Sequence, residues 1–204
     1  MLDLIKHILD PMLLIQTLGF LGIIAIVFAE TGLFFGFFLP GDSLLFVAGV
    51  LASQDILSLN YLLVFVFCAA VLGDTVGYSF GFRVGRRFFQ HDESIFFKKK
   101  YLTQTEQFFV KYGPKAVVLA RFVPIVRTFM PILAGIGKMS YKTFLSYNIF
   151  GGFLWSFGLI LLGFFFGQLI PNAEKYILLI VIIIIIVSFI PAVLELWKNR
   201  RKEL

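Results

Sequence analysis

Five ionisable side chains lie inside long apolar stretches of this sequence, and they are the residues best suited to chemistry. They are Glu30, Asp42, Asp74, Arg121 and Arg127. At the centre of a bilayer each charge costs about 2.5–3.5 kcal/mol, so all five are expected to face the protein interior and to pair, bind protons or meet water. Ionisable residues at such depth are functional candidates, although salt bridges that only hold helices together would also account for them.

The two arginines predict an anion-binding site. Arg121 and Arg127 are six residues apart and lie on either side of Pro124, so an unbroken helix would point them about 120° apart. A break at the proline would let both reach one centre, where two guanidiniums can bind a phosphate through paired hydrogen bonds. We expect Glu30 and Asp42 to neutralise them in the empty site, and these two acids and Asp74 are candidates for gating or proton coupling.

Other kinds of chemistry find little support in the sequence. His7 and His91 are the only histidines and lie outside the predicted core, and the single cysteine, Cys68, lies in an apolar run. No Ser/His/Asp set and no metal-ligand spacing is visible. We therefore expect no catalytic residues, no enzymatic activity, no metal, no cofactor and no nucleic-acid partner.

The composition predicts a membrane protein. Of the 204 residues, 59% are hydrophobic and only 15% are charged, whereas soluble domains carry about 25% charged residues. We expect four spanning helices, each near the roughly 20 apolar residues that a bilayer requires. They are Leu13–Ala29, Tyr61–Phe82, Thr143–Ile170 and Tyr176–Leu194.

Two further apolar stretches are interrupted and do not resemble spans. The stretch 30–53 is broken at Pro40 and Gly41, with Asp42 or Ser43 as a candidate helix cap, and 116–137 is broken at Pro124 and Pro131. Each half is about 15–18 Å long as a helix, which reaches only halfway through the hydrocarbon. We expect two re-entrant helical hairpins, since irregular backbone at membrane depth is tolerated only inside protein or beside water. The half-helix at the Pro40-Gly41-Asp42-Ser43 break would favour an anion at its N-terminus.

Charge distribution orients this topology. With both termini in the cytoplasm and each hairpin returning to its own side, 15 of the 18 Lys and Arg residues are cytoplasmic and only Lys175 is external. Six full crossings would weaken this bias slightly.

A shift of 86 residues reveals an internal repeat, because it aligns Ala48-Gly49 with Ala134-Gly135, and Gly77 and Gly81 with Gly163 and Gly167. Each unit is a hairpin followed by a spanning helix, and the two enter from opposite sides, as in many transporters. The predicted membrane domain therefore divides into an amphipathic start (1–12), two repeats (30–85 and 114–170), an interfacial amphipathic linker (86–113), a last span (176–196) and a basic tail (197–204).

Three stretches of this sequence resemble the DedA family, also called SNARE-associated or VTT-domain proteins. They are Glu30…Phe38-Leu39-Pro40-Gly41-Asp42-Ser43, Gly73-Asp74-Thr75-Val76-Gly77-Tyr78, and Ala120-Arg121-Phe122-Val123-Pro124-Ile125-Val126-Arg127-Thr128. The resemblance implies opposed re-entrant hairpins in a bacterial cytoplasmic membrane and a role in lipid translocation, with Glu30, Asp42, Arg121 and Arg127 as essential positions. Bacterial relatives are associated with undecaprenyl phosphate or phosphatidylethanolamine, eukaryotic ones with lipid scrambling, and the family with the proton motive force.

The leading hypothesis is a transporter of a phosphate-bearing lipid, first of all undecaprenyl phosphate, with Arg121, Arg127, Ser43 and Thr128 as substrate-binding residues. A flippase or scramblase of phosphatidylethanolamine, or of phospholipids in general, is an alternative, and a proton-coupled exchanger of small solutes is another. A structural or insertion-assisting protein is a further hypothesis, which loss of function confined to the four essential charges would disfavour. The expected partners are an anionic phospholipid or a polyprenyl phosphate, together with the membrane lipids. The glycine faces leave a homo-oligomer open because they can pack within or between chains.

Overall fold

The computed structural model describes residues 11–33, 40–84, 106–107 and 109–170, together with Tyr176, Leu179 and Ile183. Every regular element in these residues is helical, as the sequence predicts. The elements are α2 (Pro11–Gly32), α3 (Gly41–Ser53), α4 (Leu59–Val84), η3 (Gly113–Lys115), α6 (Ala116–Ala120), α7 (Pro124–Ile136) and α8 (Tyr141–Leu169). The predicted amphipathic start, the basic tail, and most of the linker 86–113 and of the last span lie outside the described residues.

Two long helices, α4 and α8, form the frame of the fold. They have 26 and 29 residues, about 39 and 44 Å at 1.5 Å per residue, and both are apolar enough to cross a bilayer of roughly 30 Å. They run antiparallel, because Val71 lies beside Gly152 while the earlier Phe67 contacts the later Phe157. Large apolar side chains such as Leu72, Phe150 and Leu162 are exposed on their outer faces, as expected for helices that face lipid.

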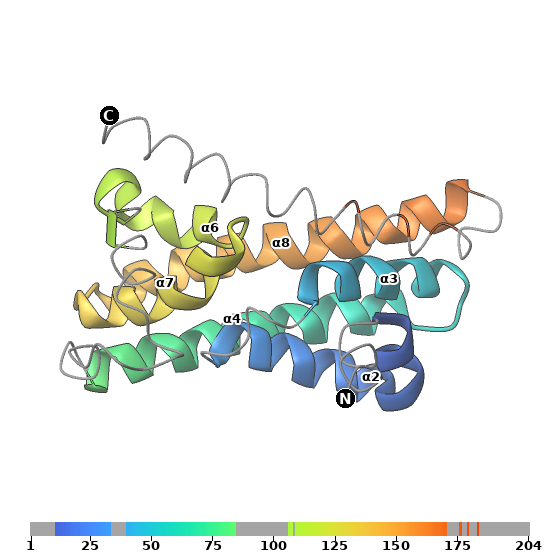
Figure 1. The fold of residues 1–204 in the computed structure, drawn as a ribbon, viewed down its shortest axis with the longest axis horizontal. Coiled ribbons are helices and arrows are strands. Elements are labelled where there is room, and N and C mark those ends of the chain that lie inside the picture. Colours follow the sequence, from blue (N-terminus) through green and yellow to red (C-terminus); the bar gives the residue numbers. More distant parts are fainter. Residues whose placement is uncertain are drawn as a thin grey trace.

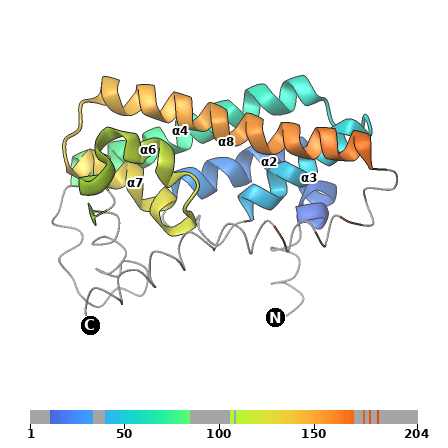
Figure 2. The same cartoon turned by 90° about the horizontal axis from the view of Figure 1, so that it is seen from above.

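The two short helices, α3 and α7, supply the core. Each has 13 residues, about 20 Å, which is too short to span the hydrocarbon alone. In α3 every residue from Ser43 to Ala52 is buried, and in α7 every residue from Val126 to Gly135 is buried. Figure 2 shows α4 and α8 side by side, with α2, α3, α6 and α7 gathered on one side of this pair.

The short and long helices pack in a crossed arrangement. Helix α3 packs chiefly against α8, which follows α7 in the chain, and α7 packs chiefly against α4, which follows α3. Figure 1 shows α3 and α7 at opposite ends of the long pair. Glycines make both contacts close: an added Cβ would lie 2.1 Å from the carbonyl oxygen of Ile160 at Gly49, and 2.2 Å from that of Tyr78 at Gly135.

These contacts correct the register of the sequence repeat. The carbonyl of Phe46 in α3 contacts Gly163 of α8, and the carbonyl of Ile132 in α7 contacts Gly81 of α4 in the same way. Phe46 and Ile132 are 86 residues apart, so the short helices correspond at the predicted shift. Gly81 and Gly163 are 82 residues apart, so the long helices correspond at a different shift. The shifts differ because α7 ends closer to Ile132 than α3 ends to Phe46, and because the link from α7 to α8 (137–140) is shorter than the link from α3 to α4 (54–58). The difference of four residues is about one helical turn, so a four-residue glycine spacing matches at either shift.

Three sequence predictions about helix continuity and boundaries are wrong in detail. The stretch Leu13–Ala29 is not one straight helix, because α2 is kinked at Gly19, whose φ of 62° and ψ of −157° only glycine adopts readily. Helix α7 runs through Pro131 instead of breaking there; a proline removes a single helical hydrogen bond, and the surrounding buried packing holds the helix. Glu30 lies in the last turn of α2, so it does not begin the first hairpin.

The break predicted at Pro124 is confirmed. Helix α6 ends at Ala120, residues 121–123 form a turn, and α7 begins at Pro124, which occupies the first helical position where its missing N–H costs nothing. At the end of the predicted linker, Gly113 has a φ of 58° and opens the short 3₁₀ turn η3. In the first predicted hairpin α3 begins at Gly41, and residues 34–39 lie outside the described part.

Candidate functional site

The N-terminal ends of α3 and α7 meet in the middle of the molecule. Asp42, the second residue of α3, lies 2.8 Å from Arg127 in the first turn of α7. From this point α3 runs to Ser53 beside Gly167, near the end of α8, and α7 runs to Gly135 beside Phe82, near the end of the antiparallel α4. Two helix N-termini, each with partial positive charge, therefore face one region, which favours an anion there.

Arg127 joins two acids in this region. One Nη atom hydrogen-bonds Oδ1 of Asp42 and the other hydrogen-bonds Oε1 of Glu30. Glu30 is fully buried, and Arg127 is 5% exposed, whereas Asp42 is partly open at 23%. Gly41 permits this approach, because a Cβ there would lie 1.5 Å from Oε2 of Glu30. One guanidinium thus bridges α2 and α3 in the interior, where an unpaired charge would be costly.

Arg121 is held by a second polar group. Its Nη2 donates to Oδ2 of Asp74 over 2.5 Å and to Oδ1 of Asn148 over 2.6 Å. The amide of Asn148 in turn donates to the backbone carbonyl of Val71 over 3.0 Å. Arg121 and Asp74 are both almost completely buried. Because Asp74 and Asn148 come from α4 and α8, the turn that carries Arg121 is fixed to both long helices.

Trp155 connects the two groups. Its ring centroid lies 5.9 Å from the guanidinium carbon of Arg121 and 5.2 Å from that of Arg127. Its indole Nε1 donates to Oδ1 of Asp42 over 2.8 Å, so this oxygen accepts from both Trp155 and Arg127. An aromatic face within about 6 Å stabilises a buried cation. All five charges predicted from the sequence therefore belong to one region around this ring.

Several buried donors of this region remain unused. Among the described residues, four such donor atoms have no hydrogen-bond partner: Nε and Nη1 of Arg121, Nε of Arg127, and Oγ1 of Thr128. Buried donors are normally satisfied, and leaving one without a partner costs about 1–3 kcal/mol. Unused guanidinium donors near two helix N-termini are what an incoming oxyanion requires. In the part of the chain that the structure describes, no three His, Cys, Asp or Glu side chains come together as a metal site would need.

Comparison with known proteins places the chain in a family. The VTT domain matches residues 39–165. Protein DedA of Escherichia coli K12 is 45% identical over 178 residues, covering 86% of this chain and 81% of that protein. The membrane protein ML0287 of Mycobacterium leprae is 40% identical over 201 residues, covering 96% and 90%. The chain belongs to the DedA family of VTT-domain membrane proteins.

Membership in the DedA family also gives the location. The inner membrane protein YqjA of Escherichia coli is 29% identical over 182 residues, covering 86% of this chain and 82% of that protein. With two relatives named as membrane proteins and two helices of spanning length, this chain is a membrane protein. The VTT match contains Asp42, Asp74, Arg121 and Arg127, and Glu30 lies before it. No solved structure matches the chain.

The two other predicted substrate-binding residues, Ser43 and Thr128, differ in whether their hydroxyl groups have a hydrogen-bond partner. Ser43 is buried and its hydroxyl donates to the carbonyl of Pro40 over 3.0 Å, so this donor is used by the residue that precedes α3. Neither Asp42 nor Ser43 caps α3, because Pro40 occupies the cap position and no side chain bonds there. Thr128 is buried next to Arg127 in sequence, with the unused hydroxyl noted above.

Sequence reasoning missed two residues that complete the region, Asn148 and Trp155. An Asn in the middle of an apolar helix is a detectable signal, because its amide must find a partner in the interior. Trp155 offered no comparable signal in a helix rich in Phe and Leu, where a ring at any position is compatible with packing.

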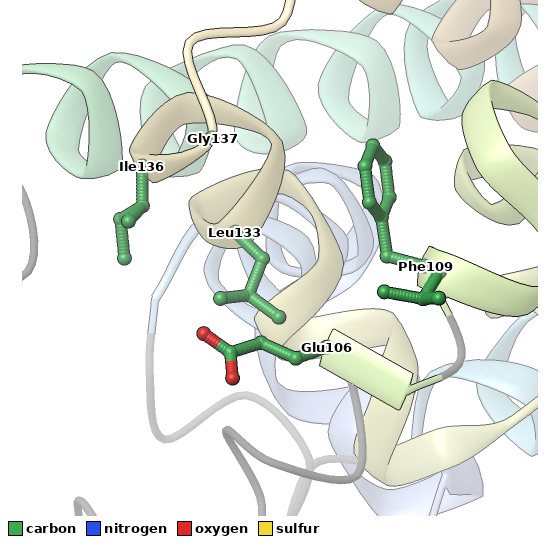
Figure 3. Close-up of a pocket in the computed structure, with 6 residues that line it drawn as sticks. Glu106, Phe109, Leu133, Ile136 and Gly137 are labelled. Atoms are coloured by element: carbon green, nitrogen blue, oxygen red, sulfur yellow. The ribbon is translucent and has the colours of Figure 1, made fainter.

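A separate pocket of about 500 Å³ lies at the other end of α7. It is lined by Glu106, Phe109, Val110, Leu133, Ile136 and Gly137. Figure 3 shows the Glu106 carboxylate on one side, facing Leu133, and Phe109 on the other. The pocket lies beside the C-terminal turns of α7, whereas the two arginines lie at its N-terminal end and in the turn before it. It is therefore distinct from the charged region.

Proposed function

We propose that this chain is a transporter, not an enzyme, that moves a phosphate-bearing lipid across the bacterial cytoplasmic membrane. One observation carries the proposal: two buried arginines keep unused N–H donors where the N-termini of α3 and α7 meet. A guanidinium binds a phosphate through two parallel N–H···O hydrogen bonds, and helix N-termini add backbone donors and a favourable dipole. Together they would replace part of the hydration that a phosphate loses on entering the membrane.

The lengths of the short helices support a path through the protein. From their meeting point α3 and α7 extend about 20 Å in opposite directions, which suits two re-entrant hairpins that enter from opposite leaflets. The headgroup would pass from one leaflet to the arginines and on to the other, while the acyl or polyprenyl tails stay in lipid. The barrier for the phosphate would then be much thinner than the whole bilayer.

The substrate we propose first is a polyprenyl phosphate such as undecaprenyl phosphate. Its terminal phosphate offers several unsubstituted oxygens, and the site offers Arg121, Arg127 and the Thr128 hydroxyl. Phosphatidylethanolamine or another phospholipid is the alternative within the same mechanism. A phosphodiester has fewer free oxygens, so we expect it to bind less tightly.

The acids favour a coupled mechanism and also a second candidate function. Three carboxylates, Glu30, Asp42 and Asp74, face only two guanidiniums in this region. A phosphate that binds the arginines takes from these acids their guanidinium partners, and taking up protons would remove the excess negative charge. A proton-coupled exchanger of small solutes would use the same excess of acids.

The test is lipid transport in proteoliposomes with an imposed pH gradient. The wild-type protein is expected to move a polyprenyl monophosphate faster than a phosphodiester lipid or a neutral lipid of equal chain length. Arg121→Ala and Arg127→Ala should each abolish this transport. Arg83→Ala is the matched control because Arg83 is exposed at the end of α4, and it should transport normally.

A pH-sensitive dye inside the same vesicles separates the two candidates. A lipid transporter coupled to protons changes the internal pH only when the phosphate lipid is present, whereas a solute exchanger does so without it. Equal transport of all headgroups, or normal transport in both arginine variants when the protein is correctly folded, would rule out the lipid-phosphate proposal.

A further inference from the structure

One face of α8 surrounds the side chain of Arg121. Asn148, Gly151, Gly152 and Trp155 follow the spacing of a single helical face. Asn148 binds the guanidinium at one end, and an added Cβ at Gly151 would lie 3.1 Å from Cδ of Arg121. Trp155 covers the other end with its ring. The glycines leave room for the arginine, while Asn148 and Trp155 fix where it points.

Trp155 also acts on the other arginine through an acid. Its ring lies beside Arg127, and its indole N–H binds the same Asp42 oxygen that binds Arg127. If a phosphate takes Arg127 from Asp42, this carboxylate keeps the indole N–H as a partner. A buried carboxylate that keeps a donor is less costly than one that loses it.

We propose that Trp155 is a positioning residue of the lipid-phosphate site: its ring spaces Arg121 and Arg127, and its N–H holds Asp42 when Arg127 turns to a phosphate. This inference rests on the proposed function and extends it to a residue of α8. The ring offers its π-face to both guanidiniums with and without bound phosphate. Arg127 therefore keeps the ring as a neighbour while it exchanges Asp42 for the phosphate. Trp155 itself need not touch the lipid.

Two substitutions separate the ring from the N–H. Trp155→Phe keeps an aromatic face and removes the donor to Asp42, so the phosphate-bound state loses a hydrogen bond to a charged group. We expect purified Trp155→Phe to bind farnesyl monophosphate about tenfold more weakly than wild type. Trp155→Leu removes the ring as well and should weaken binding further. Phe153→Leu is the matched control, because Phe153 is half-exposed on the same helix, and it should bind as wild type does.

The indole provides a direct readout that a purely structural role would not move. The chain has two tryptophans, Trp155 and Trp197, so Trp197→Phe leaves Trp155 as the only indole. Farnesyl monophosphate should shift the fluorescence emission of Trp155, because Arg127 leaves the Asp42 carboxylate to which the indole donates. The concentration that gives half of this shift should equal the concentration that gives half-maximal binding. Farnesol should cause no shift, and neither should farnesyl monophosphate when Arg127→Ala is added.

The outcomes are distinguishable. If wild-type protein binds no phosphate lipid, the proposed function fails and this inference falls with it. If wild type binds farnesyl monophosphate while Trp155→Phe binds it equally well, or while the emission of Trp155 stays unchanged, this inference alone is overturned. Thermal unfolding of each variant shows whether it is folded at the assay temperature. If Trp155→Phe binds weakly only because it is unfolded, binding will recover on cooling. That recovery would contradict the positioning role.

Discussion

Gly163 of α8 lies directly against the carbonyl oxygen of Phe46 in α3, at a separation where an added Cβ would be only 2.1 Å from that oxygen. Gly81 of α4 has the same relationship to Ile132 of α7, also at 2.1 Å. Each short helix is therefore seated on the long helix of the other half of the chain, backbone against backbone. These two contacts hold the N-termini of α3 and α7 at the charged region.

Gly163→Ala and Gly81→Ala should each destabilise the protein strongly. The new methyl group meets a backbone carbonyl that cannot rotate away, so the helices must separate, and overpacking of this kind costs about 1–3 kcal/mol or more. Gly158→Ala is the control, because nothing lies within 4 Å of its added Cβ. It should leave thermal unfolding in detergent unchanged or raise the midpoint slightly, since alanine favours helix. Equal midpoints for all three variants would show that the glycine contacts do not hold the helices.

Arg127→Ala should destabilise the protein more than a double variant that also carries Glu30→Gln. The single change leaves the fully buried Glu30 carboxylate without its guanidinium, and breaking such a pair costs about 3–5 kcal/mol. Removing the second charge recovers part of that loss, although Asp42 still lacks Arg127. Thermal unfolding gives the stabilities and proteoliposome transport gives the activity. We expect stability to recover partly and transport not at all, which separates the structural role of the ion pair from phosphate binding.

Asn148→Ala should weaken both folding and phosphate binding. It removes an acceptor from Arg121 and leaves the Val71 carbonyl without the Asn148 amide, with a cost of about 1–3 kcal/mol for the buried groups. Asn60→Ala is a suitable control, because Asn60 is exposed near the start of α4 and its loss should change stability by less than about 0.5 kcal/mol. Unfolding midpoints of the two variants, compared side by side, decide whether the contact matters.

Thr128→Val should reduce phosphate-lipid binding without reducing stability. The change keeps the shape of the side chain and removes a buried hydroxyl that has no partner among the described residues, so folding is expected to be unaffected or slightly favoured. Thr75→Val serves as control, because the Thr75 hydroxyl binds the carbonyl of Val71 within its own helix. Binding of farnesyl monophosphate to both variants is the measurement. Normal affinity in Thr128→Val would remove Thr128 from the proposed site.

Much of the site was accessible from sequence because buried charge in an apolar chain has few explanations. Glu30, Asp42, Asp74, Arg121 and Arg127 stand out against their neighbours, and the break at Pro124 explains how two arginines six residues apart can serve one region. What pattern could not provide was the pairing. Arg127 binds Glu30 and Asp42 while Arg121 binds Asp74, and nothing in the spacing of these residues chooses between this and the reverse.

The repeat illustrates the same limit. Glycines spaced by four match at shifts that differ by one helical turn, so the sequence favoured 86 for the whole unit, while the contacts require 82 for the long helices. Likewise the kink at Gly19 was invisible, because glycine in an apolar helix is common and only the backbone angles reveal a break. Pro131 was wrongly predicted to break its helix, since one lost hydrogen bond is outweighed when the whole helix is buried.

The sequence by itself determined the solvent of this protein, the helical class, and which charges had to be sheltered, because these follow from the cost of placing polar groups in hydrocarbon. Only the tertiary structure decided that α3 and α7 cross to each other's long helix, that their N-termini meet, and that Trp155 and Asn148 complete the arginine site. Those features depend on contacts between segments far apart in the chain, such as Asp42 and Trp155, which are 113 residues apart, and local chain chemistry carries no record of them.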